Sequence, residues 1–562
     1  MQEILSKTPN KEVILLGNEA IVRGALESGV QFVSTYPGTP ASEVGNTFCK
    51  IQQDSKSTLK EKGGKIKNLY FEFSINEKVA MEAAAGASFA GLRSLVAMKH
   101  FGLNVASDFF ISLCYSGVRG GMVVVVADDP GCSSSAQSEQ DSRAYSYLAH
   151  IPTLEPSTPQ ECKDFTKIAF ELSEKYKIPV MIRETTRVAL QTGVVKLGKI
   201  VPGKRKGKFI KDFHQLATMP PRVLEMKKEL FEKIRKIKKE VSDKNKINIV
   251  LTQTSRQETK GLGIIASGVS FLYVMDALNE LNLNIPVLKL GFFYPLAEEK
   301  IKSFIKNLKK VLVVEELEPY LQKEVERLAK EANAELRIFG KNSLPEVGEL
   351  KPENVIEAVA KLAGKRWGSR SSKPTVFPKR RPQLCPGCPY WLVFQGIKRA
   401  ADPKKIIFGG EIGCYMLAGL RPHCIQDYLF CMGSSAGIGH GIKKSTDQKL
   451  IALVGDSSFF HAGIPALINA SYNKSNPLII IMDNQTTAMT GHQPHPGTAK
   501  TGAGEVVPKI KIEEMVKACG VRNLKIIDPA DQKEFTKTVR QFLENKEVSV
   551  IIAQRPCLFV KS

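Results

Sequence analysis

Short apolar runs alternate with longer segments that are apolar on one side along most of the chain, and this alternation predicts an α/β fold. The strand-like runs of the first part are EVILLG, QFVSTYPGTP, LVAMKH and MVVVVADDP. Ala-rich helices are expected between them, and one of these is NEKVAMEAAAGASFAGL, which opens with Asn76. Because strands joined by helices pair in parallel, we expect mainly parallel sheets.

The same pattern predicts three α/β domains, at residues 1–200, 246–365 and 385–562. In the middle domain the expected strands are INIVLTQ, PVLKLGFF and KVLVVEEL, with the amphipathic helix SGVSFLYVMDALNEL between the first two. Residues 201–245 are expected to form a basic helical linker, and residues 366–384, which are rich in Ser, Pro, Lys and Arg, a second linker.

The chain of 562 residues carries a formal net charge of +23, and residues 201–245 hold 14 Lys and Arg against 6 Asp and Glu. We interpret this segment as a solvated basic face, with a docking surface for an acidic partner as the alternative. No nucleic-acid recognition motif accompanies the charge. The N-terminus has no signal-peptide pattern, and no apolar stretch reaches the roughly 20 residues of a membrane span. We therefore expect a cytoplasmic protein that binds neither nucleic acid nor a membrane.

Two apolar runs of the last domain end in polar residues: IALVG precedes Asp456, and LIIIMD precedes Asn484, which lies 28 positions later. Parallel strands deliver their last residues to the carboxyl edge of a sheet, where ligands bind. The helix that follows Gly455 would aim its first amides at an anion. An Asp, an Asn, a carbonyl and phosphate oxygens make a magnesium–diphosphate site. The alternative is an Asp at a turn and an Asn that caps a helix.

This frame resembles the thiamine diphosphate signature, in which the third protein ligand of magnesium is a backbone carbonyl two residues after the Asn, here that of Thr486. Thiamine chemistry also needs a carboxylate that hydrogen-bonds the cofactor's pyrimidine nitrogen N1′. Glu77 fits that position, because it lies at the start of a predicted helix. The alternative is a Glu that only stabilises the helix start.

The chain has 11 cysteines, and Cys385 and Cys388 form a C-x-x-C pair. That pair is compatible with zinc, with an iron–sulfur cluster or with no metal. A zinc site would normally add a second compact pair of Cys or His, and the sequence has none.

Nine motifs resemble, in order and along nearly the whole chain, the large subunit of indolepyruvate:ferredoxin oxidoreductase, in the 2-oxoacid:ferredoxin oxidoreductase superfamily. They are GNEAIVRGALESGV, YPGTPASEV, NEKVAMEAAAGASFAGLRSLVAMKHFGLNVA, ADDPG, EQDSR, CPGCP, IGCYM, CMGSS and NQTTAMTGHQPHPGT. The resemblance implies a pyrimidine-binding domain at 1–200 and a diphosphate-binding domain at 385–562. It also implies that residues 246–365 resemble the C-terminal domain of transketolase, with a structural or dimer role.

The resemblance implies roles for single residues as well. Glu77 would activate the pyrimidine, and Thr39 in YPGTP would contact the substrate. Magnesium and the diphosphate would be held by Gly455, Asp456, Ser457, Asn484 and Thr486, and the cofactor would be lined by Gly433 and Ser434. His492 is a candidate acid or base near the reacting carbon, and His100 is another; both rank below Glu77, because a His in such a loop is more often structural.

Some members of the superfamily have a proximal [4Fe–4S] cluster. The resemblance to them implies that the ligands of such a cluster in this chain would be Cys385, Cys388, Cys414 and Cys557. Cys424 and Cys431 are alternative ligands, or else buried core thiols. Relatives usually continue past RPC into a ferredoxin-like segment, whereas this sequence ends at Ser562. We expect those clusters on another polypeptide, or a shortened chain.

The implied function is oxidative decarboxylation of an aryl 2-oxo acid of the indolepyruvate type, with coenzyme A as co-substrate and electron transfer to ferredoxin. The implied partner is a small (β) subunit, in an (αβ)₂ assembly. Three alternatives stay open: a non-oxidative thiamine-dependent decarboxylase or lyase, an oxidoreductase for non-aromatic 2-oxo acids, and a non-catalytic subunit that retains the fold.

Overall fold

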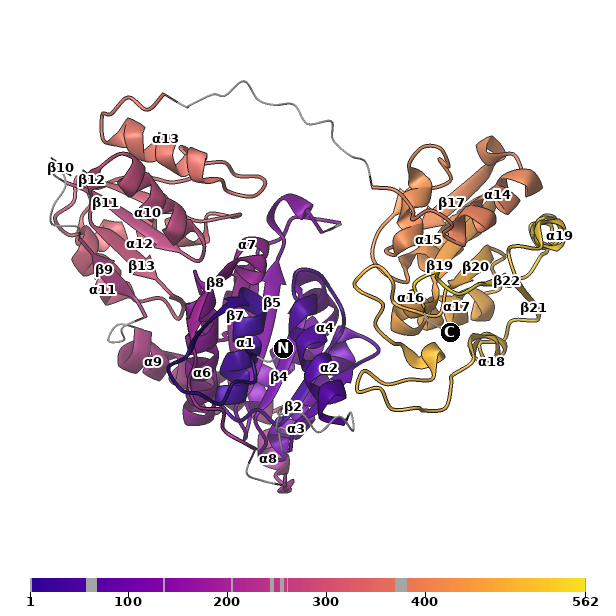
Figure 1. The fold of residues 1–562 in the computed structure, drawn as a ribbon, viewed down its shortest axis with the longest axis horizontal. Helices are drawn as coiled ribbons and strands as arrows, with labels where there is room; N and C mark the ends of the chain where they lie inside the picture. Colours follow the sequence, from indigo (N-terminus) through magenta and orange to yellow (C-terminus); the bar gives the residue numbers. More distant parts are fainter. Residues whose placement is uncertain are drawn as a thin grey trace. The chain divides into compact units, whose positions relative to one another are not determined.

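A computed structural model describes residues 3–56, 68–134, 137–203, 206–242, 247–252, 257–259, 261–368 and 382–560. The chain divides into two compact units (Figure 1). The first comprises Met1–Glu72 and Glu77–Thr375, and the second comprises Phe73–Asn76 and Val376–Ser562. The predicted domains 1–200 and 246–365 therefore belong to one unit. Most of the predicted linker 366–384 lies outside the described residues.

The first unit is built on a seven-stranded sheet of order β14-β6-β7-β5-β4-β2-β3. The pairs β2–β4, β4–β5, β5–β7 and β6–β7 are parallel, as predicted, and β14 pairs with β6 antiparallel. The strands are β2 (Phe32–Thr35), β3 (Tyr70–Phe73), β4 (Ser94–Lys99), β5 (Met122–Asp128), β6 (Thr153–Leu154), β7 (Val180–Thr185) and β14 (Phe292–Tyr294).

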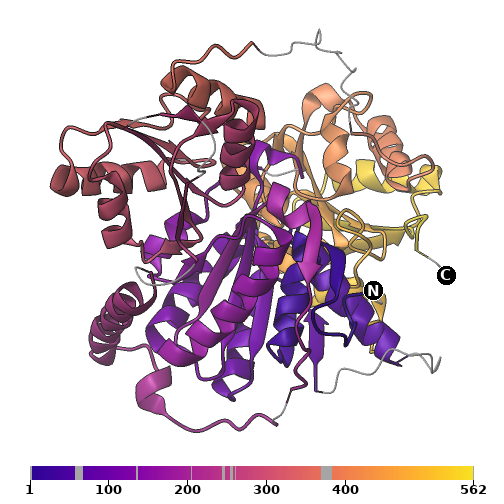
Figure 2. The same ribbon diagram turned by 60° about the vertical axis from the view of Figure 1, so that its left-hand side comes forward.

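Helices cover both faces of this sheet (Figures 1 and 2). Every residue of β5 is buried, which is why this strand reads as a continuous apolar run. Helix α1 packs against α6, and helix α3 packs against α4. The helices are α1 (Gly17–Glu27), α2 (Ser42–Lys56), α3 (Glu77–Phe89), α4 (His100–Ser116), α5 (Arg143–Leu148), α6 (Pro159–Tyr176) and α7 (Thr186–Leu190).

The first predicted strand, EVILLG, does not join the parallel sheet. It forms β1 (Glu12–Leu16), which pairs antiparallel with β8 (Thr192–Lys196) in a separate two-stranded sheet. Burial alternates along β1, with Val13 and Leu15 buried and Ile14 exposed. This alternation is typical of a strand with one solvated face, whereas the central parallel strands are buried on both faces.

The middle domain contains a strand that the sequence pattern did not indicate. Its five-stranded sheet has the order β16-β15-β11-β13-β9, and the missed strand β11 (Leu262–Ser267) is central. The predicted helix α10 (Ser270–Glu280) therefore follows β11 rather than β9. The other elements are β9 (Ile249–Leu251), β10 (Gln257–Glu258), β12 (Leu283–Asn284), β13 (Val287–Leu290), β15 (Lys310–Val314), β16 (Arg337–Phe339), α11 (Glu298–Ile305), α12 (Tyr320–Ala332) and α13 (Pro352–Leu362).

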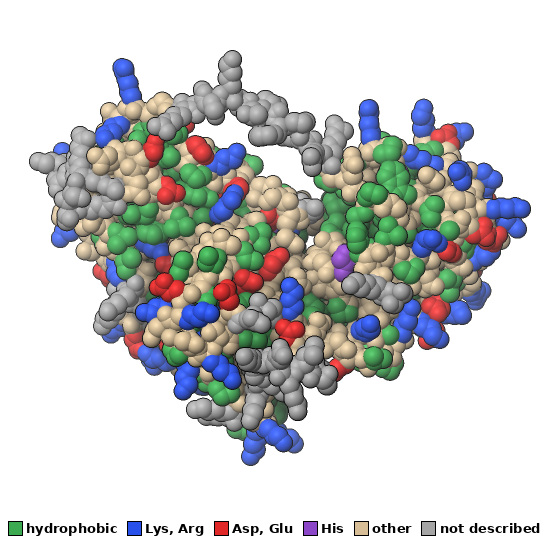
Figure 3. Space-filling model, in the orientation of Figure 1, with side chains coloured by type: hydrophobic (Ala, Val, Ile, Leu, Met, Phe, Trp, Pro, Cys, Tyr) green, Lys and Arg blue, Asp and Glu red, His purple; other side chains and the backbone are tan. Residues whose placement is uncertain are grey.

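The basic segment 201–245 is helical only in part: it contains α8 (Phe213–Leu216), α9 (Arg222–Ile237) and the π-helical stretch Lys238–Ser242, whereas residues 206–212 and 217–221 are not helical. Residues 204–205 and 243–245 of it lie outside the described residues. Helix α9 packs against α4, and its buried residues are Met226, Leu230, Ile234 and Ile237. The segment thus contains an amphipathic helix fixed to the first unit. On the face shown in Figure 3, Lys and Arg side chains are scattered rather than gathered in one patch.

The second unit is a six-stranded sheet of order β18-β17-β19-β20-β22-β21, and all of its pairs are parallel. Its strands are β17 (Ile406–Gly410), β18 (Tyr428–Leu429), β19 (Lys449–Gly455), β20 (Leu478–Asp483), β21 (Asn523–Ile527) and β22 (Ser549–Gln554). Its helices are α14 (Tyr390–Ala400), α15 (Ser434–Ser445), α16 (Asp456–Ser458), α17 (Ile464–Tyr472), α18 (Ile512–Ala518) and α19 (Gln532–Phe542). Among the described residues, none of the helices combines the length and apolar character that crossing a bilayer requires.

Candidate cofactor and metal site

The carboxyl edge of the second unit's sheet brings Asp456 and Asn484 together. β19 and β20 are parallel neighbours, with Gly455 opposite Met482. Asp456 begins the helical turn after β19, and Asn484 directly follows β20. Both side chains are buried, with 3% and 4% of the residue surface exposed. The strand–helix–strand prediction is therefore correct in its geometry.

Asp456 is held by three donors. Its Oδ1 accepts a hydrogen bond from the amide of Ser457 at 2.7 Å, and its Oδ2 accepts one from the amide of Gln485 at 2.8 Å. The Nε2 of His495 lies 3.1 Å from the same Oδ2. Because the amide of Gly497 donates to His495 Nδ1 at 3.1 Å, the ring proton is on Nε2, which donates to Asp456.

The Asn484 amide faces two different environments. One of its terminal atoms lies 2.8 Å from the carbonyl oxygen of Thr486 and 3.2 Å from Asp456 Oδ2, and the other lies 3.1 Å from Tyr390 Oη. With nitrogen on the inner side, the amide donates to both oxygens. With oxygen on the inner side, three oxygens meet. The two ends of an amide have nearly the same size and shape, so the chemistry of the neighbours decides between them.

The two separations at Asn484 are compatible with magnesium as well as with hydrogen bonds. Mg²⁺ takes octahedral oxygen ligands at about 2.0–2.1 Å, which places neighbouring ligand oxygens about 2.9 Å apart. The separations of 2.8 Å and 3.2 Å at Asn484 match this edge length. A second buried carboxylate adds to the demand for a cation: the pKa of Asp483 is raised by burial and by the neighbouring Asp456.

Two helix starts of the second unit, at Gly433–Ser434 and at Asp456–Ser457, carry the residues that are predicted to bind the diphosphate. Gly433 caps α15 with φ of 81°, and a Cβ there would lie 2.7 Å from the carbonyl carbon of Ala462, so only glycine fits. Ser434 follows it at the first turn, and its hydroxyl donates to the carbonyl of Cys431 at 2.5 Å. Ser457 is buried, and its Oγ accepts from Thr487 Oγ1 at 3.0 Å. Amides at such helix starts suit the oxygens of a diphosphate.

Of the six cysteines considered as cluster ligands, four lie near one another at the carboxyl edge of the second unit's sheet: Cys385, Cys388, Cys414 and Cys557. The pKa of Cys414 is raised to about 11 by burial and by the neighbouring thiols of Cys388, Cys557 and Cys385. The pKa of Cys388 is likewise raised to about 11 by burial, with Cys557 and Cys385 contributing. Cys557 is joined to the Asp456 region directly, since its amide donates to the carbonyl of Asn484 at 3.0 Å.

Gly387, inside the C-x-x-C loop, packs on Leu558, because a Cβ at Gly387 would lie 3.0 Å from Leu558 Cδ1. The alternative thiols Cys424 and Cys431 are exposed. Within the described ranges, no three His, Cys, Asp or Glu side chains are close enough to hold a single metal ion. A cubane cluster makes a different demand, because each thiolate binds a different iron and the four sulfurs stand further apart.

The first unit places the other predicted residues on the start of α3 and the ends of β2 and β4. Glu77 is buried at the first position of α3. Its side chain packs on α4, because a Cβ at Gly102 would lie 2.5 Å from Glu77 Cγ. The carbonyl of Thr39 accepts a hydrogen bond from Ser134 Oγ at 2.9 Å, and Ser134 Oγ in turn accepts one from Lys99 Nζ at 2.7 Å.

Four residues of these sites were not found from the sequence: Lys99, Tyr390, Glu411 and His495. Burial raises the pKa of Glu411 to about 7, although Tyr415 Oη donates to its Oε1 at 2.7 Å. His495 lies in the same motif as His492, three positions later, and only packing distinguishes them. His492 is exposed, and its ring is tilted against Phe559 at 5.7 Å. His100 is fully buried.

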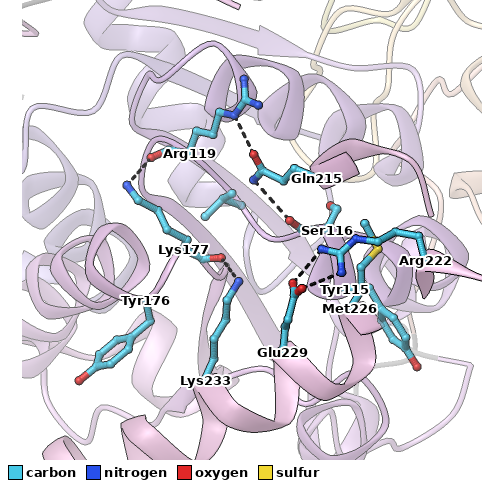
Figure 4. Close-up of a pocket in the computed structure, with 11 residues that line it drawn as sticks. Tyr115, Ser116, Arg119, Tyr176, Lys177, Gln215, Arg222, Met226, Glu229 and Lys233 are labelled. Atoms are coloured by element: carbon cyan, nitrogen blue, oxygen red, sulfur yellow. Dashed lines mark hydrogen bonds and ion pairs between the residues drawn. The ribbon is translucent and has the colours of Figure 1, made fainter. Parts of the chain in front are cut away.

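A cavity of about 370 Å³ lies elsewhere in the first unit, between the ends of α4 and α6 and the basic segment (Figure 4). Its cations are already engaged: Lys177 Nζ donates to the carbonyl of Arg119 and Lys233 Nζ to that of Lys177, both at 3.1 Å, and Arg222 is paired with Glu229. The charges of these three side chains are therefore satisfied by backbone carbonyls and by a carboxylate of the protein itself.

Comparison with known proteins adds three family matches. Residues 23–242 match the family described as pyruvate flavodoxin/ferredoxin oxidoreductase, thiamine diP-bdg, and residues 252–365 match the indolepyruvate oxidoreductase domain. Residues 411–553 match the thiamine pyrophosphate enzyme, C-terminal TPP binding domain. Together with the two parallel sheets, these matches define a thiamine-diphosphate-dependent 2-oxoacid:ferredoxin oxidoreductase.

Within that class, the chain belongs to the family of indolepyruvate oxidoreductase subunit IorA. The protein of that name from Methanothermobacter marburgensis is 45% identical, over 99% of this chain and 89% of the relative. The one from Thermococcus kodakarensis is 40% identical, over 99% of this chain and 88% of the relative. Among solved structures, a 2-oxoglutarate:ferredoxin oxidoreductase from Magnetococcus marinus aligns at 18% identity with a TM-score of 0.48, over 63% of this chain and 66% of that chain.

Proposed function

We propose that this chain is the large subunit of an enzyme that oxidatively decarboxylates aryl 2-oxo acids of the indolepyruvate type. The observation that carries the proposal is the meeting of Asp456, Asn484 and Thr486 at magnesium spacing, in a chain of this family. The aryl substrate is supported by the names of the relatives. In the balanced reaction, the 2-oxo acid, coenzyme A and two oxidised ferredoxins give acyl-coenzyme A, carbon dioxide, two reduced ferredoxins and two protons.

The residues of the second unit would hold the charged end of the cofactor. Asp456 Oδ2, the Asn484 amide oxygen and the Thr486 carbonyl would bind magnesium, and the amides after Gly433 and Gly455 would bind the diphosphate. When bound, thiamine diphosphate supplies the nucleophilic carbon and the electron sink of the reaction. His495 would orient the carboxylate of Asp456 by donating to the same Oδ2, as partners of metal ligands commonly do.

The residues of the first unit would act on the pyrimidine and the substrate. Glu77 would share a proton with N1′ of the pyrimidine, a general acid–base role for which its buried position at a helix start is suited. Thr39 would orient the substrate, and the hydrogen bond from Ser134 to its carbonyl fixes the loop that carries it. His492 stays a prediction as an acid or base.

The gathered thiols of Cys385, Cys388, Cys414 and Cys557 support a [4Fe–4S] cluster that would take electrons one at a time. The test is anaerobic purification of the Cys414→Ser variant, followed by measurement of iron, sulfide and the cluster's paramagnetic signal. We expect cluster loss in this variant and normal iron in the Cys424→Ser control. Normal iron in Cys414→Ser, or iron loss in Cys424→Ser, would contradict this ligand set.

We also propose a small subunit and ferredoxin as partners, in an (αβ)₂ assembly. The net charge of +23 favours the approach of an acidic carrier. Ferredoxin reduction should then weaken as salt is raised from about 0.01 M to about 0.15 M, over which the Debye length falls from roughly 30 Å to 8 Å. A rate of ferredoxin reduction that does not change over this range would contradict charge-guided docking.

The decisive experiment is an anaerobic assay of the complex with its small subunit, coenzyme A and a viologen dye. The substrates are indolepyruvate, phenylpyruvate, hydroxyphenylpyruvate, a branched-chain 2-oxo acid and pyruvate. We expect dye reduction that requires coenzyme A and is fastest with the aromatic acids. Carbon dioxide release without dye reduction would indicate a non-oxidative decarboxylase, and a preference for aliphatic acids would overturn the aryl assignment.

A further inference from the structure

Tyr390 lies between the cysteine cluster and the magnesium triad of Asp456, Asn484 and Thr486. It is the first residue of α14, two positions after Cys388, and only 4% of its surface is exposed. Its ring is packed edge-on against Tyr415, with centroids 5.9 Å apart and an interplanar angle of 83°. Its hydroxyl lies 3.1 Å from the outer end of the Asn484 amide. The phenol is thus fixed against the one end of Asn484 that does not face the triad.

Asn484 differs from the other two members of the triad in one respect. The carboxylate of Asp456 offers an oxygen whichever way it turns, and the ligand atom of Thr486 is a backbone carbonyl. Only the Asn484 side chain can place either an oxygen or a nitrogen on its inner side. That inner atom lies 2.8 Å from the Thr486 carbonyl oxygen and 3.2 Å from Asp456 Oδ2. With nitrogen inside, the amide donates to both oxygens and presents no ligand atom to a cation.

The hydroxyl of Tyr390 can serve either orientation. When the amide nitrogen is inside, the phenol O–H donates to the outer amide oxygen. When the amide oxygen is inside, the outer N–H donates to the phenol oxygen, because a phenol both donates and accepts. Without that hydroxyl, the ligating orientation leaves a buried N–H without its partner, whereas the nitrogen-inside orientation keeps both of its inner hydrogen bonds.

We propose that Tyr390 is a positioning residue that lets Asn484 turn its amide oxygen toward a divalent cation. The proposal rests on the proposed function, because it assumes the magnesium site. The phenol reverses its hydrogen-bonding role, from donor to acceptor, when the cation arrives. In this role Tyr390 acts through Asn484 and not on the reacting atoms.

The test uses Mn²⁺ in place of Mg²⁺, because the electron paramagnetic resonance signal of free Mn²⁺ reports binding directly. The complex with its small subunit is titrated in the presence of thiamine diphosphate, as wild type, Tyr390→Phe, Asn484→Asp and the double variant. We expect Tyr390→Phe to weaken Mn²⁺ binding about 10- to 100-fold, the usual effect of removing a partner of a metal ligand. The Asn484→Asp side chain has two equivalent oxygens and no orientation to choose, so Tyr390→Phe should change Mn²⁺ affinity less than about threefold in that background.

Tyr428→Phe is the matched control. It removes another phenol of the second unit, partly buried on β18, whose hydroxyl donates to the carbonyl of Ser435 at 2.9 Å. Thermal unfolding of each variant verifies that it is folded. If Tyr390→Phe lowers Mn²⁺ affinity equally with and without the Asn484→Asp substitution, or lowers it in neither case, the inference alone is overturned. A folded wild-type complex that takes up no Mn²⁺ would overturn the inference together with the proposed metal site.

Discussion

The seven-stranded sheet of the first unit and the six-stranded sheet of the second differ in how buried charges near their carboxyl edges are paired. In the first unit, Asp128 at the end of β5 is paired with Arg183 at 2.7 Å, and Arg143 is paired with Glu155 at 2.6 Å and Glu315 at 2.9 Å. In the second unit, Asp456 and Asp483 are also buried. Neither of these two carboxylates forms an ion pair with a Lys or Arg among the residues described.

The difference separates structure from function. Buried charges are tolerated when each has a partner, so the paired edge stabilises the fold of the first unit. Because neither carboxylate is ion-paired with a Lys or Arg in the described part of the chain, this edge favours a charge from outside, which a metal ion can provide. Removing a charge should therefore have opposite consequences in the two units.

The largest effect is expected from Glu77, the carboxylate of the first unit for which we propose a chemical role. We expect Glu77→Gln to lower turnover by about 10²- to 10⁴-fold, because the amide cannot exchange a proton with the pyrimidine. Cofactor binding, measured by calorimetry, should remain. The control is Glu82→Gln on the same helix, a surface residue paired with Lys78. Full activity of Glu77→Gln would place the acid–base group elsewhere.

Breaking a pair in the first unit should destabilise it strongly. Arg143→Met leaves the carboxylates of Glu155 and Glu315 buried without their partner, at a cost of about 3–5 kcal/mol in the free energy of unfolding. Hydrogen exchange of β5 and β15 measures this change. Arg187→Met is the control, because its ion pair with Glu349 at 2.7 Å is half-exposed and should be worth less than about 1 kcal/mol. Equal effects of the two substitutions would refute the contrast.

Removing a charge from the second unit should have the reverse effect on the metal-free fold. Asp456→Asn relieves the repulsion with Asp483, so the unfolding temperature without metal should stay the same or rise. If Asp456 binds magnesium as proposed, the same substitution should weaken binding of magnesium and thiamine diphosphate about 100-fold or more, since it removes a direct ligand. Differential scanning calorimetry with and without the two ligands measures both effects. A metal-free variant that unfolds well below the wild type would show that Asp456 has a structural role.

The effect that is smallest over one pH unit concerns Glu184, a buried acid of the first unit that forms no ion pair with a Lys or Arg among the described residues. The pKa of Glu184 is raised to about 8 by burial and by Glu43, against an unfolded value of about 4.3. Between these pH values the folded chain holds a proton that the unfolded chain has released, so stability falls as pH rises from about 4 to about 8. Glu184→Gln should match the wild type near pH 4 and become increasingly more stable toward pH 8, by at most about 1.4 kcal/mol per pH unit. Parallel unfolding-temperature profiles of both proteins would contradict this assignment.

The sequence predicted those parts of the fold and site that depend on local order along the chain. Asp456 and Asn484 follow two apolar strands that pair in parallel, so their proximity follows from topology alone. Glu77 follows from a helix start. Both inferences use only short-range pattern and the rule that parallel strands share one carboxyl edge.

The missed features depend on which surfaces pack together. An apolar pattern does not reveal a strand's partner, so EVILLG was assigned to the wrong sheet and β11 was overlooked. The choice between His492 and His495 depends on which ring is buried against Asp456. Tyr390 meets Asn484 across 94 positions of sequence, and no local signal marks that contact.

The strand β14 has a practical consequence for anyone who would divide this chain. The family matches separate at residues 242 and 252, yet β14, at Phe292–Tyr294, completes the sheet of the preceding domain by pairing with β6. Expressing residues 1–245 alone would uncover β6 as a bare edge, whose free amides and carbonyls recruit other chains into aggregates. A fragment that is to stay monodisperse must therefore retain the middle domain, which contributes β14, or include another strand that pairs with β6.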